Sequence, residues 1–152
     1  IVRNVGVSNF EVEHLQDLLE MTDVAPIAIN QIQFNPWMVT EWVESARFCH
    51  QNGIGIMGWN TLGGSLAQHD NVYTVQTLTD LASKYNRTVA QIMLRWAIQM
   101  GAVVIPGTGN PMYMKENLAI YEFELTKAEM DSISALRDDE PGKITSMAFQ
   151  ME

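Results

Sequence analysis

Four short apolar runs, rich in β-branched residues, alternate along this chain with segments of helical period. The runs cover residues 5–7, 27–34, 54–59 and 103–105. Alternation of this kind favours parallel strands joined by right-handed crossovers, with each connecting helix packed on the sheet. The sequence therefore predicts an α/β protein of four strand–helix units. Four units fit either an open doubly wound sheet or half of a (βα)8 barrel, and their number leaves both open.

Start and stop signals for helices lie between these runs. The apolar spacing after residue 10 predicts a helix that stops before Pro26, because a proline disfavours the helical conformation of the residue before it. Thr40 is expected to cap a second helix, and Gly53 to end it. Thr88 with Gln91 has the spacing of a capping box and predicts another helix start.

Three more helices are expected in the second half of the chain. One carries its apolar stripe at 75–82, and Gly101 ends the helix that begins after Thr88. Another begins at Asn110 and the proline that follows it, and the last at Thr126-x-x-Glu129.

The stretch after the fourth run, residues 103–117, has the composition of an anion site. Pro106 ends the strand because it cannot donate to the sheet, and a Gly-Thr-Gly segment then lets the backbone approach a ligand closely. Asn110 and Pro111 start a helix whose unpaired N–H groups point back at this loop. The stretch indicates a phosphate site, or alternatively an ordinary strand-to-helix turn with good capping.

Composition excludes several classes of partner and site. The net charge is −9 without any basic cluster, so we expect no nucleic acid and no membrane surface as partners. A single cysteine, Cys49, fits a reducing compartment and a cytoplasmic location. His14, His50 and His69 have no metal-ligand spacing with each other or with Cys49, so no metal site is expected.

Five short motifs, taken in order, resemble the aldo-keto reductases. They are VGVSNF at 5–10, NQIQ at 30–33, QIMLRW at 91–96, VIP at 104–106 and KEN at 115–117. ELT at 124–126 fits the same family. The resemblance is to the C-terminal half of that family's (βα)8 barrel. It implies four parallel strands with flanking helices over residues 1–137, and we expect residues 138–152 to form a flexible C-terminal tail.

Members of this family transfer hydride between NAD(P)H and a carbonyl. By resemblance, Ser8, Asn9 and Gln31 hold the nicotinamide carboxamide, whose donors and acceptor these side chains complement. Trp59 stands where the family usually has an aromatic residue, often tyrosine, that stacks on the nicotinamide ring. The alternatives are a capped turn for Ser8 and Asn9, a polar barrel interior for Gln31, and core packing for Trp59.

The resemblance continues into the loop after Trp59. Asn60, Leu62 and Gly63 match the loop that contacts the cofactor pyrophosphate. The usual Ser-Pro of that loop is Asn60-Thr61 here, which makes the loop less rigid.

At the adenosine end the chain departs from the family pattern. Many NADP-preferring relatives carry a lysine and an arginine where this chain has Gly107 and Tyr113. Thr108 remains, as do Glu116 and Asn117, which by resemblance contact the adenine or its ribose. Losing two cationic partners weakens recognition of a 2′-phosphate, so we expect NAD or NADP as cofactor, with NADH use favoured.

The family's catalytic aspartate, tyrosine, lysine and histidine come from the N-terminal half of its barrel. No segment of this chain matches those motifs, so no catalytic residue is assigned. The resemblance implies a cofactor-binding half of a reductase that is inactive alone. We expect it to require its missing half or to self-associate as a homo-oligomer. The alternative is a non-enzymatic relative that serves as a binding or assembly module.

Overall fold

The computed structural model describes residues 2–21, 25–63 and 72–137. Its sheet has four strands, which are β1 (Val5–Ser8), β2 (Ile27–Gln33), β3 (Gly55–Trp59) and β4 (Ala102–Val104). The expected tail at 138–152 lies outside the described residues. The predicted fourth strand, 103–105, is displaced by one residue toward the N-terminus.

All four strands are parallel and lie in the order β1-β2-β3-β4. A doubly wound sheet reverses its strand order at a switch point, whereas the strands of a barrel follow one another around the axis. The sequential order therefore selects the half barrel from the two arrangements that the sequence leaves open.

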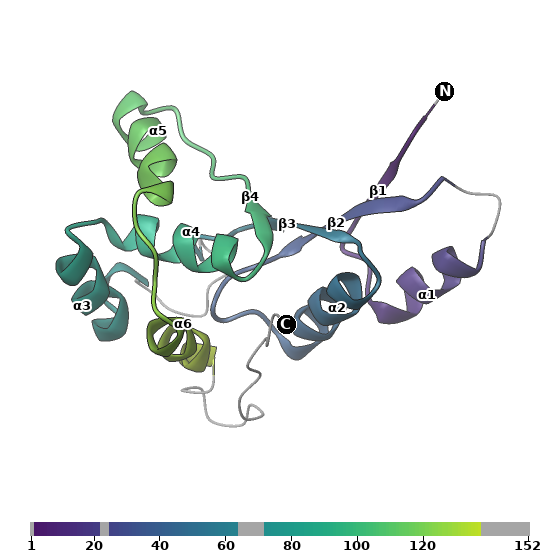
Figure 1. Cartoon of the computed structure of the whole chain (residues 1–152), viewed down its shortest axis with the longest axis horizontal. Coiled ribbons are helices and arrows are strands. Elements are labelled where there is room, and N and C mark those ends of the chain that lie inside the picture. Colours follow the sequence, from purple (N-terminus) through teal and green to yellow (C-terminus); the bar gives the residue numbers. More distant parts are fainter. Residues whose placement is uncertain (1, 22–24, 64–71, 138–152) are drawn as a thin grey trace.

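In the described part of the chain, six α-helices connect or follow these strands. They are α1 (Val12–Glu20), α2 (Thr40–Gln51), α3 (Gln76–Tyr85), α4 (Val89–Gln99), α5 (Pro111–Leu118) and α6 (Lys127–Ser134). Short 3₁₀ turns lie at η1 (Val72–Thr74), η2 (Ala119–Tyr121) and η3 (Ala135–Arg137). Figure 1 shows α1, α2, α4 and α6 on one side of the sheet, with α5 raised beyond the end of β4. The helices thus cover one face of the sheet, as the outer layer of a barrel does.

Most of the predicted helix starts are confirmed. The capping boxes at Thr88 and Thr126 are both formed, and the Asn110 side chain accepts a hydrogen bond from the Met112 backbone. The predicted cap at Thr40 is wrong, because Val39 is the N-cap and Thr40 is already helical. The Val39 side chain accepts no capping hydrogen bond, so α2 begins without the help expected from a hydroxyl.

Residues on neighbouring strands form rows across the sheet, and successive rows face opposite sides. Ser8, Gln31, Met57 and Val103 make one row, and Val7, Asn30, Ile56 and Ala102 make the next. In the second row Asn30 is 0%, Ile56 6% and Ala102 5% exposed, so this row lies on the helix-covered face. In the first row Val103 is 55% exposed. We call that side the open face.

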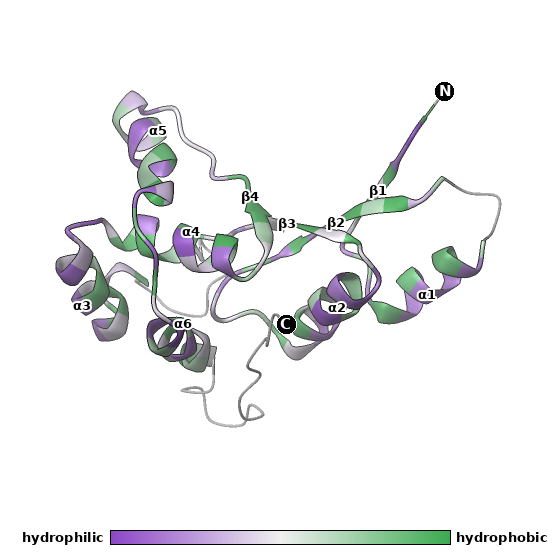
Figure 2. Ribbon diagram, viewed as in Figure 1, coloured by the Kyte–Doolittle hydropathy of each residue, from purple (hydrophilic) through white to green (hydrophobic). Residues whose placement is uncertain are grey.

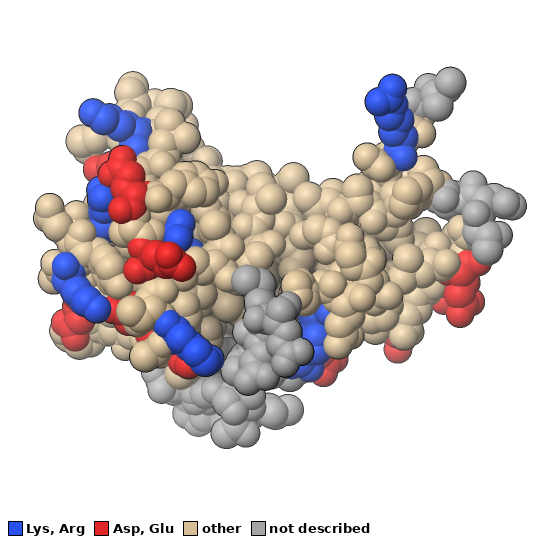
Figure 3. Space-filling model, viewed as in Figure 1, with Lys and Arg blue, Asp and Glu red and all other residues tan. Residues whose placement is uncertain are grey.

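The core fills the space between the sheet and the helices. Its largest fully buried side chains include Trp96, Phe34, Leu15, Ile32, Leu78, Ile92, Met93, Leu94 and Ile133. The ring centroids of Phe34 and Trp96 lie 5.5 Å apart, which joins the end of β2 to α4. Figure 2 shows hydrophobic residues along the strands and a mixture of hydrophobic and hydrophilic residues on each helix. Figure 3 shows charged side chains gathered over α3, α5 and α6, whereas the surface over the middle of the sheet carries none.

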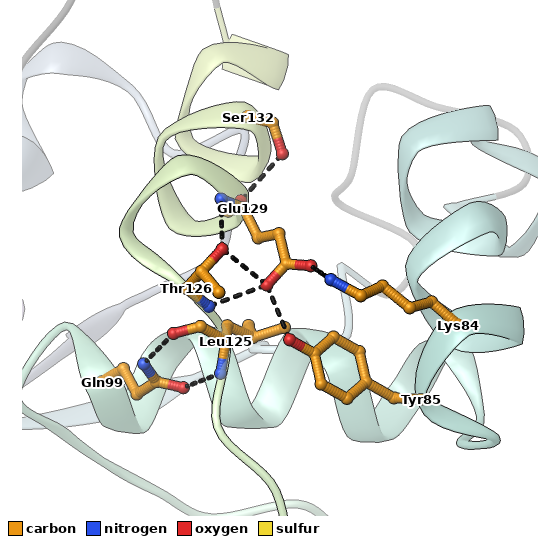
Figure 4. Close-up of polar contacts among 7 residues, drawn as sticks. All are labelled: Lys84, Tyr85, Gln99, Leu125, Thr126, Glu129 and Ser132. Atoms are coloured by element: carbon orange, nitrogen blue, oxygen red, sulfur yellow. Dashed lines mark hydrogen bonds and ion pairs between the residues drawn. The ribbon is translucent and has the colours of Figure 1, made fainter.

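A polar cluster holds α6 against α3 (Figure 4). The Glu129 carboxylate accepts hydrogen bonds from Lys84 Nζ, from Tyr85 Oη at 2.7 Å and from the Thr126 backbone at 2.7 Å. Burial of this carboxyl raises its pKa, but the hydrogen bonds from Lys84, Tyr85 and Thr126 outweigh burial and lower the pKa to about 2. Nearby, the Gln99 amide makes two hydrogen bonds with the Leu125 backbone, so α4 anchors the start of α6.

Candidate functional site

The four predicted nicotinamide contacts meet where the first three strands end. Ser8 Oγ and the Asn9 backbone N–H both donate to the Gln31 carbonyl, at 3.1 and 2.8 Å. Trp59 Nε1 donates to Asn9 Oδ1 at 3.0 Å, and Gln31 Nε2 donates to Met57 Sδ at 3.0 Å. We call Ser8, Asn9, Gln31 and Trp59 the strand-end cluster. It lies at the carboxyl ends of parallel strands, where barrel enzymes place their active sites.

A buried amide on β2 braces the turn that carries Asn9. Asn30 is fully buried, and its Nδ2 donates to the Phe10 carbonyl at 2.8 Å while its Oδ1 accepts from the Phe10 N–H at 3.4 Å. Asn9 itself has a φ of 56°, a left-handed conformation that few residues other than glycine and asparagine adopt readily. Asn30 therefore stabilises this turn from the helix-covered face of the sheet. The sequence by itself assigned no role to Asn30.

A second buried amide braces the loop after β3. Asn35 Nδ2 donates to the Asn60 carbonyl at 3.2 Å, and Asn35 Oδ1 accepts from the Trp37 backbone at 3.0 Å. Asn60 also has a positive φ, 53°, and its carbonyl accepts from the Gly63 backbone at 3.0 Å. Within the described part of the chain, the buried Nδ2 of Asn60 has no acceptor. This loop therefore carries an unpaired donor where the resemblance places the pyrophosphate.

A cavity of about 520 Å³ lies between this loop, the start of α4, and α5. Its lining residues are Leu62, Tyr73, Thr88, Ala90, Gly107, Thr108, Tyr113, Glu116 and Asn117. We call this cavity the α5 pocket. It gathers the predicted residues of the adenosine end and, from the loop, Leu62, whereas Asn60 and Gly63 are not among its lining residues. Its volume lies within the range typical of ligand sites.

Three lining residues of the α5 pocket were not predicted as site residues, namely Tyr73, Thr88 and Ala90. Thr88 was identified only as a helix cap. Nothing in the local sequence predicts that the first turn of α4 lies beside α5. In the structure a hydrogen bond between distant residues joins the two helices. Gln91 caps α4 and also donates from Nε2 to the Glu116 carbonyl at 2.9 Å, which fixes α5 against α4.

The loop before α5 leaves open space above its backbone. A Cβ added at Gly107 or at Gly109 would meet no atom within 4 Å. Thr108 Oγ1 accepts from the Asn110 backbone at 3.1 Å, and Asn110 caps α5. Among the described lining residues only Glu116 is charged, so none of them offers a side-chain cation to a 2′-phosphate.

Other candidate sites are not supported. Burial raises the pKa of the Cys49 thiol more than the hydrogen bond from Asn30 lowers it, so Cys49 is a core residue and a poor nucleophile. Across residues 2–21, 25–63 and 72–137, no group of three or more His, Cys, Asp or Glu side chains is placed to bind a metal ion. None of the helices in these ranges is both long and apolar enough to cross a membrane.

Comparison with known proteins agrees with this geometry. The model of the aldo/keto reductase family matches residues 1–138. The chain belongs to the aldo/keto reductase family. It is 37% identical over 139 residues to an uncharacterized oxidoreductase, YtbE, and 38% identical over 140 residues to a glyoxal reductase, both from Bacillus subtilis. Each match covers 91% of this chain but only 46% and 48% of the relative, so the chain spans about half the length of these relatives.

Solved structures give the same result. The Bombyx mori aldo-keto reductase in complex with NADP superimposes with a TM-score of 0.76 at 33% identity, covering 87% of this chain and 44% of that one. Gox0644 in its apo form gives a TM-score of 0.76 at 33% identity, covering 93% and 49%. The predicted fold, half of a (βα)8 barrel with four parallel strands, is confirmed.

Proposed function

We propose that this chain is the cofactor-binding half of a reductase that transfers hydride between NAD(P)H and a carbonyl. One observation carries the proposal. The residues that the family resemblance assigns to the two ends of the cofactor lie at the strand-end cluster and in the α5 pocket, and the loop at 60–63 leads from one to the other. Similar proteins support a nicotinamide cofactor, since two of the solved structures are complexes with NADP and NADPH.

The strand-end cluster suits a primary carboxamide. Gln31 Nε2 is engaged with Met57, which leaves Gln31 Oε1 as an acceptor for the carboxamide NH2 group. Ser8 Oγ donates to a backbone carbonyl and keeps its lone pairs as acceptors. A bound nicotinamide supplies hydride from its ring, and this cluster would orient that ring through its amide substituent.

We further propose that NADH binds at least as well as NADPH. Gly107 and Tyr113 replace the usual cations, and Glu116 lines the same pocket. Hydrogen bonds to charged groups contribute about 1.5–3 kcal/mol each, so a 2′-phosphate would lose most of its recognition here. A ribose with free hydroxyls fits the neutral and acidic lining better.

Titration of the chain with both cofactors tests this proposal. Gly107→Lys should move the preference toward NADPH by tenfold or more, because the backbone there leaves room for the new side chain. Gly109→Lys is the matched control, with equal charge and equal space two residues away. A native preference for NADPH of tenfold or more would contradict the proposal, as would equal shifts in the two variants.

The proton donor for carbonyl reduction is proposed to lie outside this chain. The described structure leaves one sheet face open and two strand edges, β1 and β4, unpaired within the sheet. Exposed edges and apolar faces favour association, so we propose completion by the missing barrel half or by a second copy. The isolated chain should sediment as an oligomer and show no NADH oxidation with glyoxal. A stable monomer or real turnover would contradict this.

A non-enzymatic binding or assembly module is the second candidate, and the same open face supports it. Restoring a complementary half that carries an aspartate, tyrosine and lysine set discriminates the two. Turnover in that assembly supports the reductase, whereas association without turnover supports the module. The cytoplasmic location proposed from the single cysteine accords with either function.

A further inference from the structure

We propose that Trp59 is a positioning residue that sets the orientation of the Asn9 side-chain amide. The inference rests on the proposed nicotinamide cofactor and adds a role for the indole N–H that is separate from ring stacking. Its basis is the 3.0 Å hydrogen bond from Trp59 Nε1 to Asn9 Oδ1, between residues 50 positions apart in the sequence.

The hydrogen bond spans one whole strand. Trp59 ends β3 and Asn9 follows β1, and β2 lies between them in the sheet. Adjacent strands are about 4.8 Å apart, so the indole must extend across the end of β2 to reach Asn9. Trp59 therefore links the first and third strands at the edge where the ligand is proposed to bind.

The chemistry of the two groups determines the polarity of the contact. An indole N–H is a donor only, whereas a side-chain amide has one acceptor oxygen and a donor NH2 group. Asn9 must therefore turn Oδ1 toward Trp59. Its Nδ2 has no acceptor among the described residues and is left to donate to a ligand. A tyrosine hydroxyl can both donate and accept, and a phenylalanine has no polar group, so neither residue at position 59 would fix which amide atom of Asn9 turns toward it.

The resulting pattern is complementary to a carboxamide. Asn9 Nδ2 is a donor for the carboxamide oxygen, and Gln31 Oε1 is an acceptor for its NH2 group. The backbone of Asn9 is already held by Gln31 and by the Asn30 brace on Phe10, so the two side-chain torsions of Asn9 are the remaining freedom. The hydrogen bond from Trp59 restricts these torsions before the ligand binds, and such preorganisation increases affinity.

The test compares NADH with ADP-ribose, which lacks the nicotinamide and reports on the rest of the site. Trp59→Phe keeps an aromatic ring and removes the N–H. It should weaken NADH binding about fivefold relative to ADP-ribose, the weight of one neutral hydrogen bond. Trp42→Phe, a half-buried tryptophan on α2, is the matched control and should leave the ratio of the two affinities unchanged.

A double-mutant cycle separates positioning from stacking. In an Asn9→Gly background, where glycine keeps the left-handed φ of this turn, Trp59→Phe should cause no further loss, because the amide that it orients is gone. An equal fivefold loss in both backgrounds, or no loss in the single variant, would overturn the inference while leaving the proposed cofactor intact. Failure of the wild-type chain to bind either ligand would overturn the proposed function and this inference together.

A ligand-free measurement tests the hydrogen bond itself. The Trp59 indole resonance, assigned by its absence in Trp59→Phe, should move upfield and exchange faster with solvent in Asn9→Gly, because glycine keeps the turn and removes the acceptor. An unchanged resonance would overturn the inference without bearing on the proposed cofactor.

Discussion

Asn30 and Gln31 are neighbours on β2 and carry the same functional group, yet they lie on opposite faces of the sheet. Asn30 lies under the helices, is fully buried, and uses both amide atoms on Phe10. Gln31 lies on the open face and is half-buried, and its side chain makes one hydrogen bond to a described residue, Met57, which leaves Oε1 as an acceptor. Burial requires that a polar group be paired within the protein, whereas an open position can keep hydrogen-bonding capacity for a ligand.

The same contrast extends to whole rows of the sheet. On the covered face, apolar side chains pack against helices and the polar ones brace turns. The open face carries both apolar and polar side chains, such as Ile29 and Gln31 on β2, which are half-buried rather than buried. Residues on the covered face thus contribute to stability, and residues on the open face are available for binding. Substitutions on the covered face should mainly lower stability, and those on the open face should mainly weaken binding.

The largest effect is expected from one isoleucine pair on β2. Ile32 is fully buried on the covered face, and Ile29 is half-buried on the open face. Ile32→Ala should lower the free energy of unfolding by about 3 kcal/mol, and Ile29→Ala by about 1 kcal/mol or less. Urea unfolding of both variants measures this. Equal losses would mean that the open face is covered in solution, and would remove the contrast.

Acid should lower the free energy of unfolding by protonating Glu129, whose carboxylate joins α6 to α3 on the covered side of the sheet. Its pKa is lowered from 4.5 to about 2, so its contribution is present above pH 4.5 and is lost as pH falls toward 2. We expect a loss of about 2 kcal/mol over that window, and Glu129→Gln should largely abolish this pH dependence. Unfolding curves at several pH values test it. The same slope in the variant would assign the loss to other carboxylates.

The smallest effect compares the two neighbouring amides directly. Asn30→Ala should cost about 1–2 kcal/mol of unfolding free energy, because it leaves the partly buried Phe10 backbone groups without these hydrogen bonds. Gln31→Ala should change stability little but weaken NADH relative to ADP-ribose about fivefold. Chemical unfolding and ligand titration of both variants measure the two quantities. A stability loss in Gln31→Ala as large as that of Asn30→Ala would break the division between the faces.

Local signals in the sequence predicted most of the elements. Pro106 ends the fourth strand region, Gly53 and Gly101 follow helices with positive φ, and Thr88 and Thr126 cap as expected. Thr40 failed as a cap because the chain enters α2 one residue earlier, where Val39 takes the extended conformation. Helix boundaries depend on a few neighbouring residues, so the exact first and last residue of a helix is the part of the secondary structure that the sequence determines least.

The candidate site was less accessible to sequence reasoning. Similarity of motifs identified both the strand-end residues and most of the α5 pocket, but Tyr73 and Ala90 carried no signal of their own. The residue pattern of β2 also does not tell which face of the strand is covered, since Ile29 and Ile32 lie on opposite faces. Nothing in the sequence marks Asn30 as buried.

The sequence by itself determined where strands and helices form and which family this chain belongs to, because capping, proline stops and short motifs act over a few residues. Only the tertiary structure decided which face of each strand is covered and which distant groups meet. The contact between Trp59 and Asn9 depends on the order and register of three strands. Those are properties of the assembled sheet, since each strand is placed by hydrogen bonds to partners far away in the chain.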